Sequence, residues 1–259
     1  MEPLGMLIDF TECIGCGECV KACQQANDLP QDPDLTDLSA RNYTVVLQQD
    51  EQYYRKLCMH CQEPTCASVC PVGAFTKTEQ GPVLYDADKC MGCRYCMMAC
   101  PFGVPRYEWD KAIPVVQKCI FCAHRLAEGK ESACAWVCPM GATRMGTRSH
   151  LLEIAKSRIE RHPDKYVNYV YGELDAGGTS IMMLSAVPFE QLGYRMDLRQ
   201  GPMPELTWQV LSKIPSIVVT GGVLLGGLSW IINRRIKIET GELREDELSG
   251  DKEKEAGDE

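Results

Sequence analysis

The chain has 259 residues, of which 45% are hydrophobic and 24% charged, as in an ordinary globular protein. The formal net charge is −9, but residues 239–259 hold ten acidic and three basic side chains, so the remainder is close to neutral. Because no stripe of Lys and Arg is present, the composition argues against a nucleic-acid-binding protein. The N-terminal segment has neither a basic region nor an apolar core before a cleavage site, so we expect no signal peptide.

Sixteen cysteines are arranged in four groups of four, and no cysteine lies outside these groups. The groups are Cys13, Cys16, Cys19 and Cys23; Cys58, Cys61, Cys66 and Cys70; Cys90, Cys93, Cys96 and Cys100; and Cys119, Cys122, Cys134 and Cys138. Three residues separate the last two cysteines of every group, and a proline follows the last cysteine of the final three groups. Such runs are the ligand pattern of bacterial ferredoxins.

The spacing suits an iron–sulfur cubane, which needs one soft thiolate on each of its four iron corners. Two residues between cysteines let one tight loop place three sulfurs, and Gly15, Gly17 and Gly92 allow the backbone to pass close to a cluster. Three residues before the last cysteine suit one helical turn, which directs that thiol toward a neighbouring cluster. At four ligands per cluster, sixteen thiolates predict four [4Fe–4S] clusters.

Two other uses of cysteine fit the chain less well. Disulfide frameworks belong to short secreted proteins, whereas this chain has 259 residues. Zinc accepts pairs of cysteines two residues apart, but the repeated third and fourth cysteines exceed what a tetrahedral zinc site uses.

Residues 1–148 are predicted to form an α+β domain of two interleaved ferredoxin-like dicluster units. Short strands are expected at 43–48, 81–85 and 105–109, between the cysteine groups. Residues 24–57 are rich in Asp, Gln and Pro and are predicted to be an insertion that forms a surface lobe. Because such small units bury little apolar surface, the clusters are expected to supply much of the folding energy.

Residues 149–205 are predicted to form an extension that packs on the cluster domain or on a partner. An amphipathic helix is expected over 149–161, with Ser149 as its N-terminal cap and His162-Pro163 at its end. Strands are expected at 166–170 and 180–185, on either side of a turn at Gly177 and Gly178.

The segment 214–233 has twenty residues without a charge, enough for a helix of about 30 Å, the thickness of the bilayer hydrocarbon. A buried core helix is the alternative, but the position after the globular part favours one transmembrane helix within an anchor at 206–237. Arg234, Arg235 and Lys237 follow the segment and Lys213 precedes it, so the positive-inside rule places the tail 238–259 in the cytoplasm. This acidic tail is predicted to be disordered.

The cluster domain is then expected in the periplasm, on the other side of a bacterial inner membrane. Clusters are assembled in the cytoplasm, so this domain has to cross the membrane already folded. We therefore expect a partner subunit to supply a twin-arginine export signal and to carry this chain along.

The four groups, with eleven residues between Cys122 and Cys134, resemble the four-cluster electron-transfer subunits of the dimethyl-sulfoxide-reductase and formate-dehydrogenase type. Family-typical surroundings include CMHC at 58–61, PTC at 64–66 and KCIFCAHRL at 118–126. The stretches 171–179 and 187–193, followed by a single span, look most like the iron–sulfur subunit of hydrogenase-2-type complexes. The similarity covers about residues 7–237.

The resemblance implies which cysteines bind each cluster. Site 1 takes Cys13, Cys16, Cys19 and Cys138; site 2 takes Cys119, Cys122, Cys134 and Cys23; site 3 takes Cys58, Cys61, Cys66 and Cys100; and site 4 takes Cys90, Cys93, Cys96 and Cys70. Some relatives have tryptophan in the third group and hold a three-iron cluster, whereas Cys93 is intact here, so four cubanes are expected. The resemblance also places site 4 nearest the membrane partner.

The function implied by the resemblance is an electron relay between a catalytic subunit and an integral, quinone-reactive membrane subunit. A [NiFe] hydrogenase is the first candidate for the catalytic subunit, and a molybdopterin enzyme such as formate dehydrogenase is the alternative. No flavin or nicotinamide motif and no catalytic side-chain set is present, so the chain is not expected to be an enzyme by itself. Ordered ligand spacing also disfavours a purely structural or metal-storing protein. His60 and Lys118, beside the cysteines, are expected either to tune the clusters or to pack around them.

Overall fold

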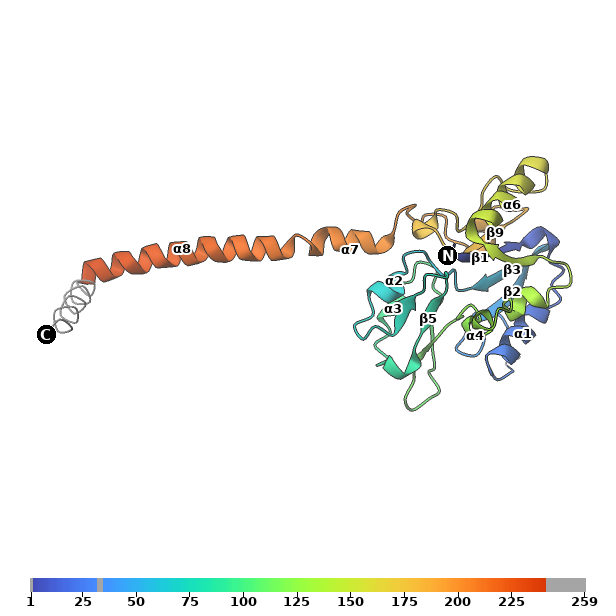
Figure 1. Cartoon of the computed structure of the whole chain (residues 1–259), viewed down its shortest axis with the longest axis horizontal. Coiled ribbons are helices and arrows are strands. Elements are labelled where there is room, and N and C mark those ends of the chain that lie inside the picture. Colours follow the sequence, from blue (N-terminus) through green and yellow to red (C-terminus); the bar gives the residue numbers. More distant parts are fainter. Residues whose placement is uncertain (1, 32–34, 241–259) are drawn as a thin grey trace. The chain divides into compact units, whose positions relative to one another are not determined.

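The computed structural model describes residues 2–31 and 35–240. The chain divides into two compact units, Met1–Glu205 and Leu206–Glu259. Short helices and strands are mixed through the first unit (Figure 1), which confirms the predicted α+β class. The predicted boundary near residue 148 stays a prediction. Most of the predicted acidic tail lies outside the described residues, and only residues 238–240 are described, as the end of the last helix.

A three-stranded sheet organises the first unit. Its order is β8 (Thr143–Thr147), β1 (Leu4–Asp9) and β9 (Ile181–Leu184), with β1 antiparallel to β8 and parallel to β9. Met6 is the register partner of both Met145 and Ile181. The sheet therefore joins the N-terminal strand to two segments that follow the cysteine groups.

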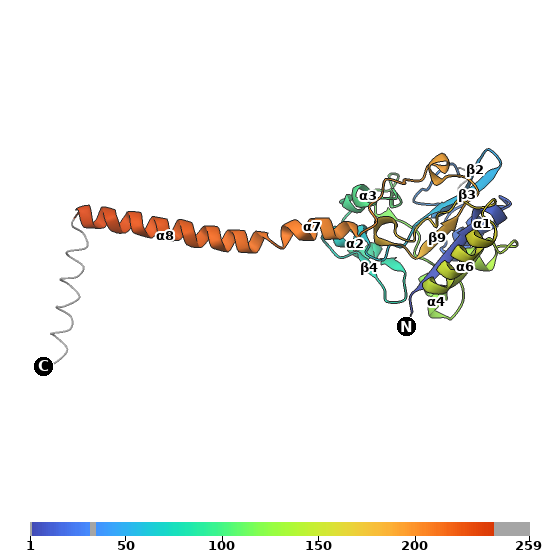
Figure 2. The same ribbon diagram turned by 90° about the horizontal axis from the view of Figure 1, so that it is seen from above.

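The two faces of this sheet are covered by different parts of the chain. Helix α6 (Arg148–Arg161) lies along β1 and β9 (Figures 1 and 2) and covers one face, where its Leu151 and Ala155 contact Leu7. Met6 and Ile8 point to the other face, into a core with aromatic side chains. This division follows from the alternation of side chains along a strand.

Two pairs of short helices carry the third cysteine of each group. Helix α1 (Glu18–Ala26) contacts α5 (Ala133–Trp136), and α2 (Thr65–Ser68) contacts α3 (Tyr95–Ala99). The first pair joins the two ends of the cysteine-rich region, whereas the second pair lies between them in sequence. In Figure 1 helices α2 and α3 lie together, apart from α1 and α4 (Ala123–Ala127). This is the interleaved arrangement that was predicted.

Three antiparallel hairpins connect the helices. They are β2 (Thr44–Gln49) with β3 (Gln52–Leu57), β4 (Phe75–Lys77) with β5 (Val83–Tyr85), and β6 (Arg106–Tyr107) with β7 (Val116–Gln117). Strands thus occur at all three predicted places, although β6 has only two residues. The first hairpin buries Val45, Tyr54 and Leu57. The prediction that 24–57 is a surface lobe is therefore wrong for this hairpin, because one side of it packs into the core although its turn is polar.

The helix predicted after the sheet forms, but its cap was wrongly assigned. Helix α6 begins at Arg148 with Thr147 at its N-cap position, because β8 runs directly into the helix. Ser149 lies in the first helical turn, and its hydroxyl donates a hydrogen bond to the carboxylate of Glu2. Both Thr and Ser favour the cap position, so the local sequence did not distinguish them.

The strand predicted at 166–170 does not form. This segment runs beside β9 and makes a hydrogen bond from Val167 N–H to the Ser185 carbonyl, but its only bridge comes at Tyr171, opposite Met183. The Tyr166 hydroxyl donates to the buried Asp9 carboxylate at 2.8 Å. Side-chain contacts of this kind have overridden the strand propensity of the segment.

Two helices end the described part of the chain, α7 (Met203–Leu211), which starts just before the second unit, and α8 (Ile214–Thr240). Counted together, Met203–Thr240 are 38 residues, long and apolar enough to cross a membrane, and none of the apolar window is buried within the protein. Helix α8 begins where the transmembrane helix was predicted and continues seven residues beyond Asn233. One C-terminal helix therefore fits a single membrane anchor.

Candidate iron–sulfur sites

All sixteen cysteines lie in the described part of the chain, and all are free thiols. Only Cys16 and Cys93 are exposed, whereas the other fourteen are buried or half-buried. In each group the third cysteine lies inside α1, α2, α3 or α5, and the fourth lies in that helix or within two residues of its end. The helical turn predicted from the three-residue spacing is therefore present in all four groups.

Two of these helices begin at a residue with a left-handed backbone. Gly17 precedes α1 with a φ of 73°, and Arg94 precedes α3 with a φ of 61°. Each follows the second cysteine of its group, so the chain reverses direction between the loop thiols and the helical thiol. This conformation costs glycine little but is unfavourable for arginine, and such strain is found where a site requires one backbone shape.

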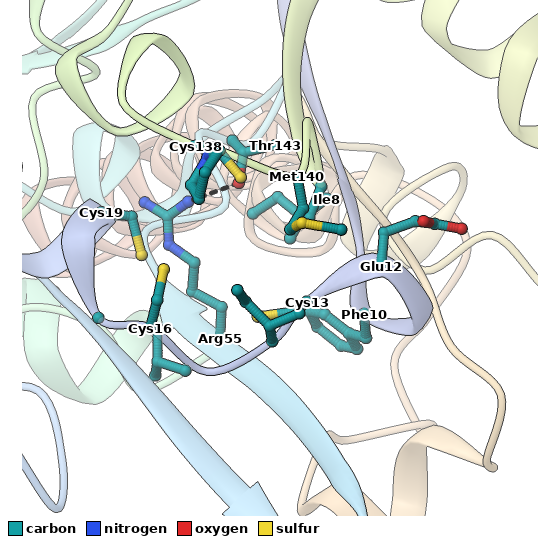
Figure 3. Close-up of a pocket in the computed structure, with 15 residues that line it drawn as sticks. Ile8, Phe10, Glu12, Cys13, Cys16, Cys19, Arg55, Cys138, Met140 and Thr143 are labelled. Atoms are coloured by element: carbon teal, nitrogen blue, oxygen red, sulfur yellow. Dashed lines mark hydrogen bonds between the residues drawn. The ribbon is translucent and has the colours of Figure 1, made fainter.

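Site 1 is a cavity lined by the thiols of Cys13, Cys16, Cys19 and Cys138. Figure 3 shows these four residues around one hollow, into which the side chain of Arg55 extends. Cys138 reaches this cavity from the last cysteine group, because β1 and β8 are neighbours in the sheet. Ile8 and Phe10 also line the cavity. Four soft donors with apolar walls and one cation suit an anionic iron–sulfur cluster.

Site 2 brings Cys23 from the first group to three cysteines of the last group. Burial raises the pKa of Cys23 well above its usual value, and the neighbouring charges of Cys119, Cys134 and Cys122 raise it further. Thiols that raise one another's pKa lie close together and stay protonated in the absence of a metal. Binding to iron releases these protons, because the ligand is the thiolate.

In the second and third cysteine groups, too, the last thiol of each group acts on a thiol of the other. Burial raises the pKa of Cys61 well above its usual value, and Cys58, Cys100 and Cys66 add to the effect. For Cys96 burial is again the largest cause, followed by Cys90, Cys93 and Cys70, and its pKa is about 11. Thiols of the same implied set therefore act on one another's pKa, and the four ligand sets and the binding of a cluster to each stay predictions.

Thiols of consecutive sets also act on one another's pKa. Burial raises the pKa of Cys119 in site 2 to about 12, and the next cause is the charge of Cys58 in site 3. Cys134 of site 2 acts on Cys19 of site 1, and Cys96 of site 4 acts on Cys66 of site 3. Sites 1 and 4, at the two ends, contain the exposed thiols of Cys16 and Cys93.

Backbone amides also face the thiols. The N–H groups of Gly92, Phe121 and Ala74 donate to the sulfur atoms of Cys90, Cys119 and Cys70 at 3.4, 3.3 and 3.2 Å. Hydrogen bonds to ligand sulfur stabilise the thiolate and raise the reduction potential of a cluster. The loops therefore supply donors as well as ligands.

Sequence reasoning missed two of the cations beside the sites, Arg55 and Lys77. The ammonium of Lys77 donates to the carbonyl oxygens of Cys61 at 2.9 Å and Gly81 at 2.6 Å. Lys118, which the sequence did single out, is buried and donates to the carbonyl of Cys119 at 2.8 Å. No pattern in the sequence marks Arg55 or Lys77, because each lies on a strand, β3 or β4, that only the fold brings to the thiols.

Comparison with known proteins assigns the domains. The family model for a 4Fe-4S dicluster domain matches residues 49–148, and the model for a 4Fe-4S binding domain matches residues 6–26. The second range contains the first cysteine group, and the first range contains the other three groups. These matches show that the cofactors are [4Fe–4S] clusters.

Curated relatives extend the similarity over most of the chain. A protein of Nitratidesulfovibrio vulgaris is 43% identical, over 92% of this chain and 69% of the relative. The hydrogenase-2 operon protein HybA of Escherichia coli O157:H7 is 35% identical, over 90% of this chain and 85% of HybA. The iron–sulfur subunit of the nitrate-inducible formate dehydrogenase of Escherichia coli K12 is also 35% identical, over 86% of this chain and 76% of that subunit.

Proposed function

This chain belongs to the family of iron–sulfur electron-transfer subunits that includes HybA and the formate dehydrogenase iron–sulfur subunits, and on that premise we propose its place in a complex. It receives electrons from a catalytic subunit and passes them to a membrane subunit, or carries them in the reverse direction. The observation that carries this proposal is that thiols of consecutive sets act on one another's pKa, while the first and last sets each contain an exposed thiol.

Each thiol set is proposed to hold one [4Fe–4S] cluster, with the ligands named above for sites 1 to 4. Neighbouring sets share electrostatic contacts, so an electron moves between clusters without leaving the protein interior. The exposed ends differ in their surroundings. Met91, Tyr95 and Met98 are exposed beside site 4, and Ile14 and Met140 are exposed beside site 1. Exposed apolar side chains around a redox site fit contact with other subunits.

The first candidate for the catalytic partner is a [NiFe] hydrogenase, since the relatives include a hydrogenase-2 operon protein. A molybdopterin enzyme such as formate dehydrogenase is the second candidate, supported by relatives of the same percentage identity. A multi-span, quinone-reactive membrane subunit is the proposed partner at the other end. By this proposal substrate chemistry lies in the partners, and the chain alone has no turnover.

The proposed location is a bacterial inner membrane, with helix α8 as a single span. Arg234, Arg235 and Lys237 follow the apolar segment and Lys213 precedes it, so the C-terminus is proposed to be cytoplasmic and the cluster domain periplasmic. Protease treatment of spheroplasts tests this orientation, because a periplasmic domain is degraded while the cells stay intact. Protection of the domain until the cells are lysed would exclude it.

Single Cys→Ser variants test the cluster assignment most directly. Cys138→Ser and Cys13→Ser, from opposite ends of the cysteine-rich region, are expected to abolish the same EPR signal. Cys23→Ser is the matched control, because it lies in the same sequence group as Cys13 but belongs to site 2. Each variant is expected to lose about a quarter of the iron of a four-cluster protein. If Cys23→Ser and Cys13→Ser abolish the same signal, the proposed ligand sets are wrong.

Purification of the tagged chain from anaerobically grown cells, in mild detergent, tests the partners. A hydrogenase partner is expected to bring hydrogen-dependent dye reduction with the chain, and a formate dehydrogenase partner brings formate-dependent reduction. Mass spectrometry of the same sample identifies the co-purifying subunits. Recovery of a cluster-loaded chain without any catalytic subunit would contradict the relay between subunits.

A further inference from the structure

Arg55 is the only arginine that is buried in the described part of the chain, with 3% of its surface exposed. Its Nε donates to the hydroxyl of Thr44 at 2.8 Å, and its Nη1 donates to the hydroxyl of Thr143 at 3.1 Å. Both threonines are buried as well. These uncharged hydroxyls fix the direction of the guanidinium but do not neutralise its charge.

The guanidinium reaches two of the thiol sets. Figure 3 shows it among the thiols of Cys16, Cys19 and Cys138 in the cavity of site 1. On the other side lies Cys134 of site 2. Burial raises the pKa of Cys134, but the charge of Arg55, a hydrogen bond from it and a hydrogen bond from Ser132 together bring the pKa below its usual value. The cation therefore lies between sites 1 and 2.

No carboxylate balances this charge. Across residues 2–31 and 35–240, Arg55 makes no ion pair with Asp or Glu. The partly buried Arg158, by contrast, pairs with Asp9. An unpaired charge in a protein interior is strongly unfavourable unless an opposite charge is bound nearby. Thiolate-ligated clusters on both sides supply such a charge.

We propose that Arg55 is a counter-ion shared by the clusters of sites 1 and 2, and that it raises the reduction potentials of both. This inference rests on the proposed ligand sets. Reduction of either site adds one electron, which comes from a neighbouring cluster or from the catalytic partner, and no bond to Arg55 forms or breaks. Arginine keeps its proton throughout, so its charge is present in both oxidation states.

The position between the sites has a second consequence. An electron on site 1 repels an electron on site 2, because both add negative charge to a poorly screened interior. A cation between them attracts both electrons, so it favours the state in which both sites are reduced. Arg55 thereby offsets part of the repulsion between electrons on the two sites.

Lys118 offers a matched comparison at the next junction. Its ammonium donates to the carbonyl of Cys119 in site 2, and its charge partly offsets the burial that raises the pKa of Cys66 in site 3. Replacement of Lys118 is therefore expected to affect sites 2 and 3 but not site 1. Arg195, an exposed arginine paired with Asp197, serves as a control for the loss of an arginine elsewhere.

The test is an EPR-monitored redox titration of the purified complex that carries Arg55→Gln. Glutamine keeps a hydrogen-bond donor but removes the charge. We expect the equilibrium constant for reduction of sites 1 and 2 to fall at least tenfold, which lowers each reduction potential by about 59 mV for one electron. Sites 3 and 4 should keep their potentials, and Arg195→Gln should change none. In Lys118→Gln the reduction potentials of sites 2 and 3 should fall instead. Arg55→Lys should restore most of the potential that Arg55→Gln loses.

Iron and acid-labile sulfide are counted in every sample before titration. Unchanged potentials in a fully loaded Arg55→Gln complex would overturn this inference while leaving the cluster assignment intact. Too few irons in the unaltered complex would instead contradict the proposed function. If Arg55→Gln loses clusters while Arg55→Lys keeps them, the positive charge is required and the inference stands. Equal cluster loss in both variants would show that the shape of arginine matters rather than its charge, and would also overturn it.

Discussion

The backbone N–H of Val83 donates a hydrogen bond to Nδ1 of His60 at 2.9 Å, and both residues are buried. Burial, with the charges of Lys118 and Lys77, holds the pKa of His60 well below its usual value, so the ring is neutral. Because Nδ1 accepts, the proton of the ring lies on Nε2. The ring also meets Phe121 edge-on, with 4.9 Å between centroids. His60 thus ties the loop of site 3 to β5 and to the loop of site 2.

Replacement of His60 by alanine leaves the Val83 N–H without a partner in the interior. We expect a loss of about 1–3 kcal/mol in the free energy of unfolding. Asparagine is the matched variant, because its side-chain oxygen can take the place of Nδ1 and it tolerates the left-handed φ of 49°. The temperature at which the visible cluster absorbance is lost should fall more for His60→Ala than for His60→Asn. Equal midpoints for the two variants would show that the Val83 hydrogen bond contributes little.

Gly15 and Gly17 test whether the loop of site 1 requires glycine for its backbone angle or for space. Both have a positive φ, 71° and 73°. A Cβ at Gly15 would lie 2.4 Å from the ring of Tyr53, whereas a Cβ at Gly17 would meet nothing within 4 Å. Gly17→Ala is therefore expected to cost about 1 kcal/mol from backbone strain alone.

Gly15→Ala carries the same strain and in addition displaces Tyr53, so it should cost more and should reduce the iron content of site 1. Iron analysis and the thermal midpoint of each variant measure the difference. A Gly15→Ala protein as stable and as well loaded as Gly17→Ala would mean that Tyr53 moves aside freely.

The ion pair between Asp9 and Arg158 connects the central sheet to helix α6. The Asp9 side chain is 1% exposed and also accepts the hydroxyl of Tyr166. Removal of the cation in Arg158→Met leaves a buried carboxylate unpaired, which is expected to cost about 3–5 kcal/mol. A second change, Asp9→Asn, removes the orphaned charge and should recover part of the loss. Denaturation midpoints of the two single variants and the double variant measure this coupling, and strictly additive losses would contradict it.

The sequence was sufficient to predict the thiols because cluster chemistry restricts their spacing. Two residues between ligands and three before the last one appear in the structure as a loop and a short helix. The spacing also predicts that the last thiol of a group turns toward a neighbouring cluster. The particular exchange of Cys23 with Cys138, and of Cys70 with Cys100, was implied only by the resemblance and stays a prediction.

Arg55 illustrates what the sequence could not predict. Alternation along a strand places consecutive side chains on opposite faces, so one of Tyr54 and Arg55 would be expected to face solvent. Both are buried. Tyr54 belongs to the aromatic core, whereas Arg55 enters the cavity of site 1. A strand between a core and a cofactor site has no solvent face, and no local pattern reveals that arrangement.

Helix α8 provides a prediction about the membrane. Leu224 lies at the middle of the uncharged segment 214–233, and Asn233 lies at its end beside Arg234. An arginine at the centre of a transmembrane helix costs about 2.5–3.5 kcal/mol on insertion scales, whereas one at the end extends its charge to the headgroups. Leu224→Arg should therefore shift part of the chain from the carbonate-resistant membrane fraction to the soluble fraction.

Asn233→Arg is the matched control, since it adds the same side chain to the same helix and should remain in the membrane fraction. Both variants need to be expressed without the proposed membrane partner, because contacts with another subunit could retain the chain even if α8 inserts poorly. If Leu224→Arg and Asn233→Arg then behave alike, α8 does not cross the hydrocarbon region. The apolar side chains of α8 would in that case have to be covered by protein, and the chain would be attached to the membrane only through its partners.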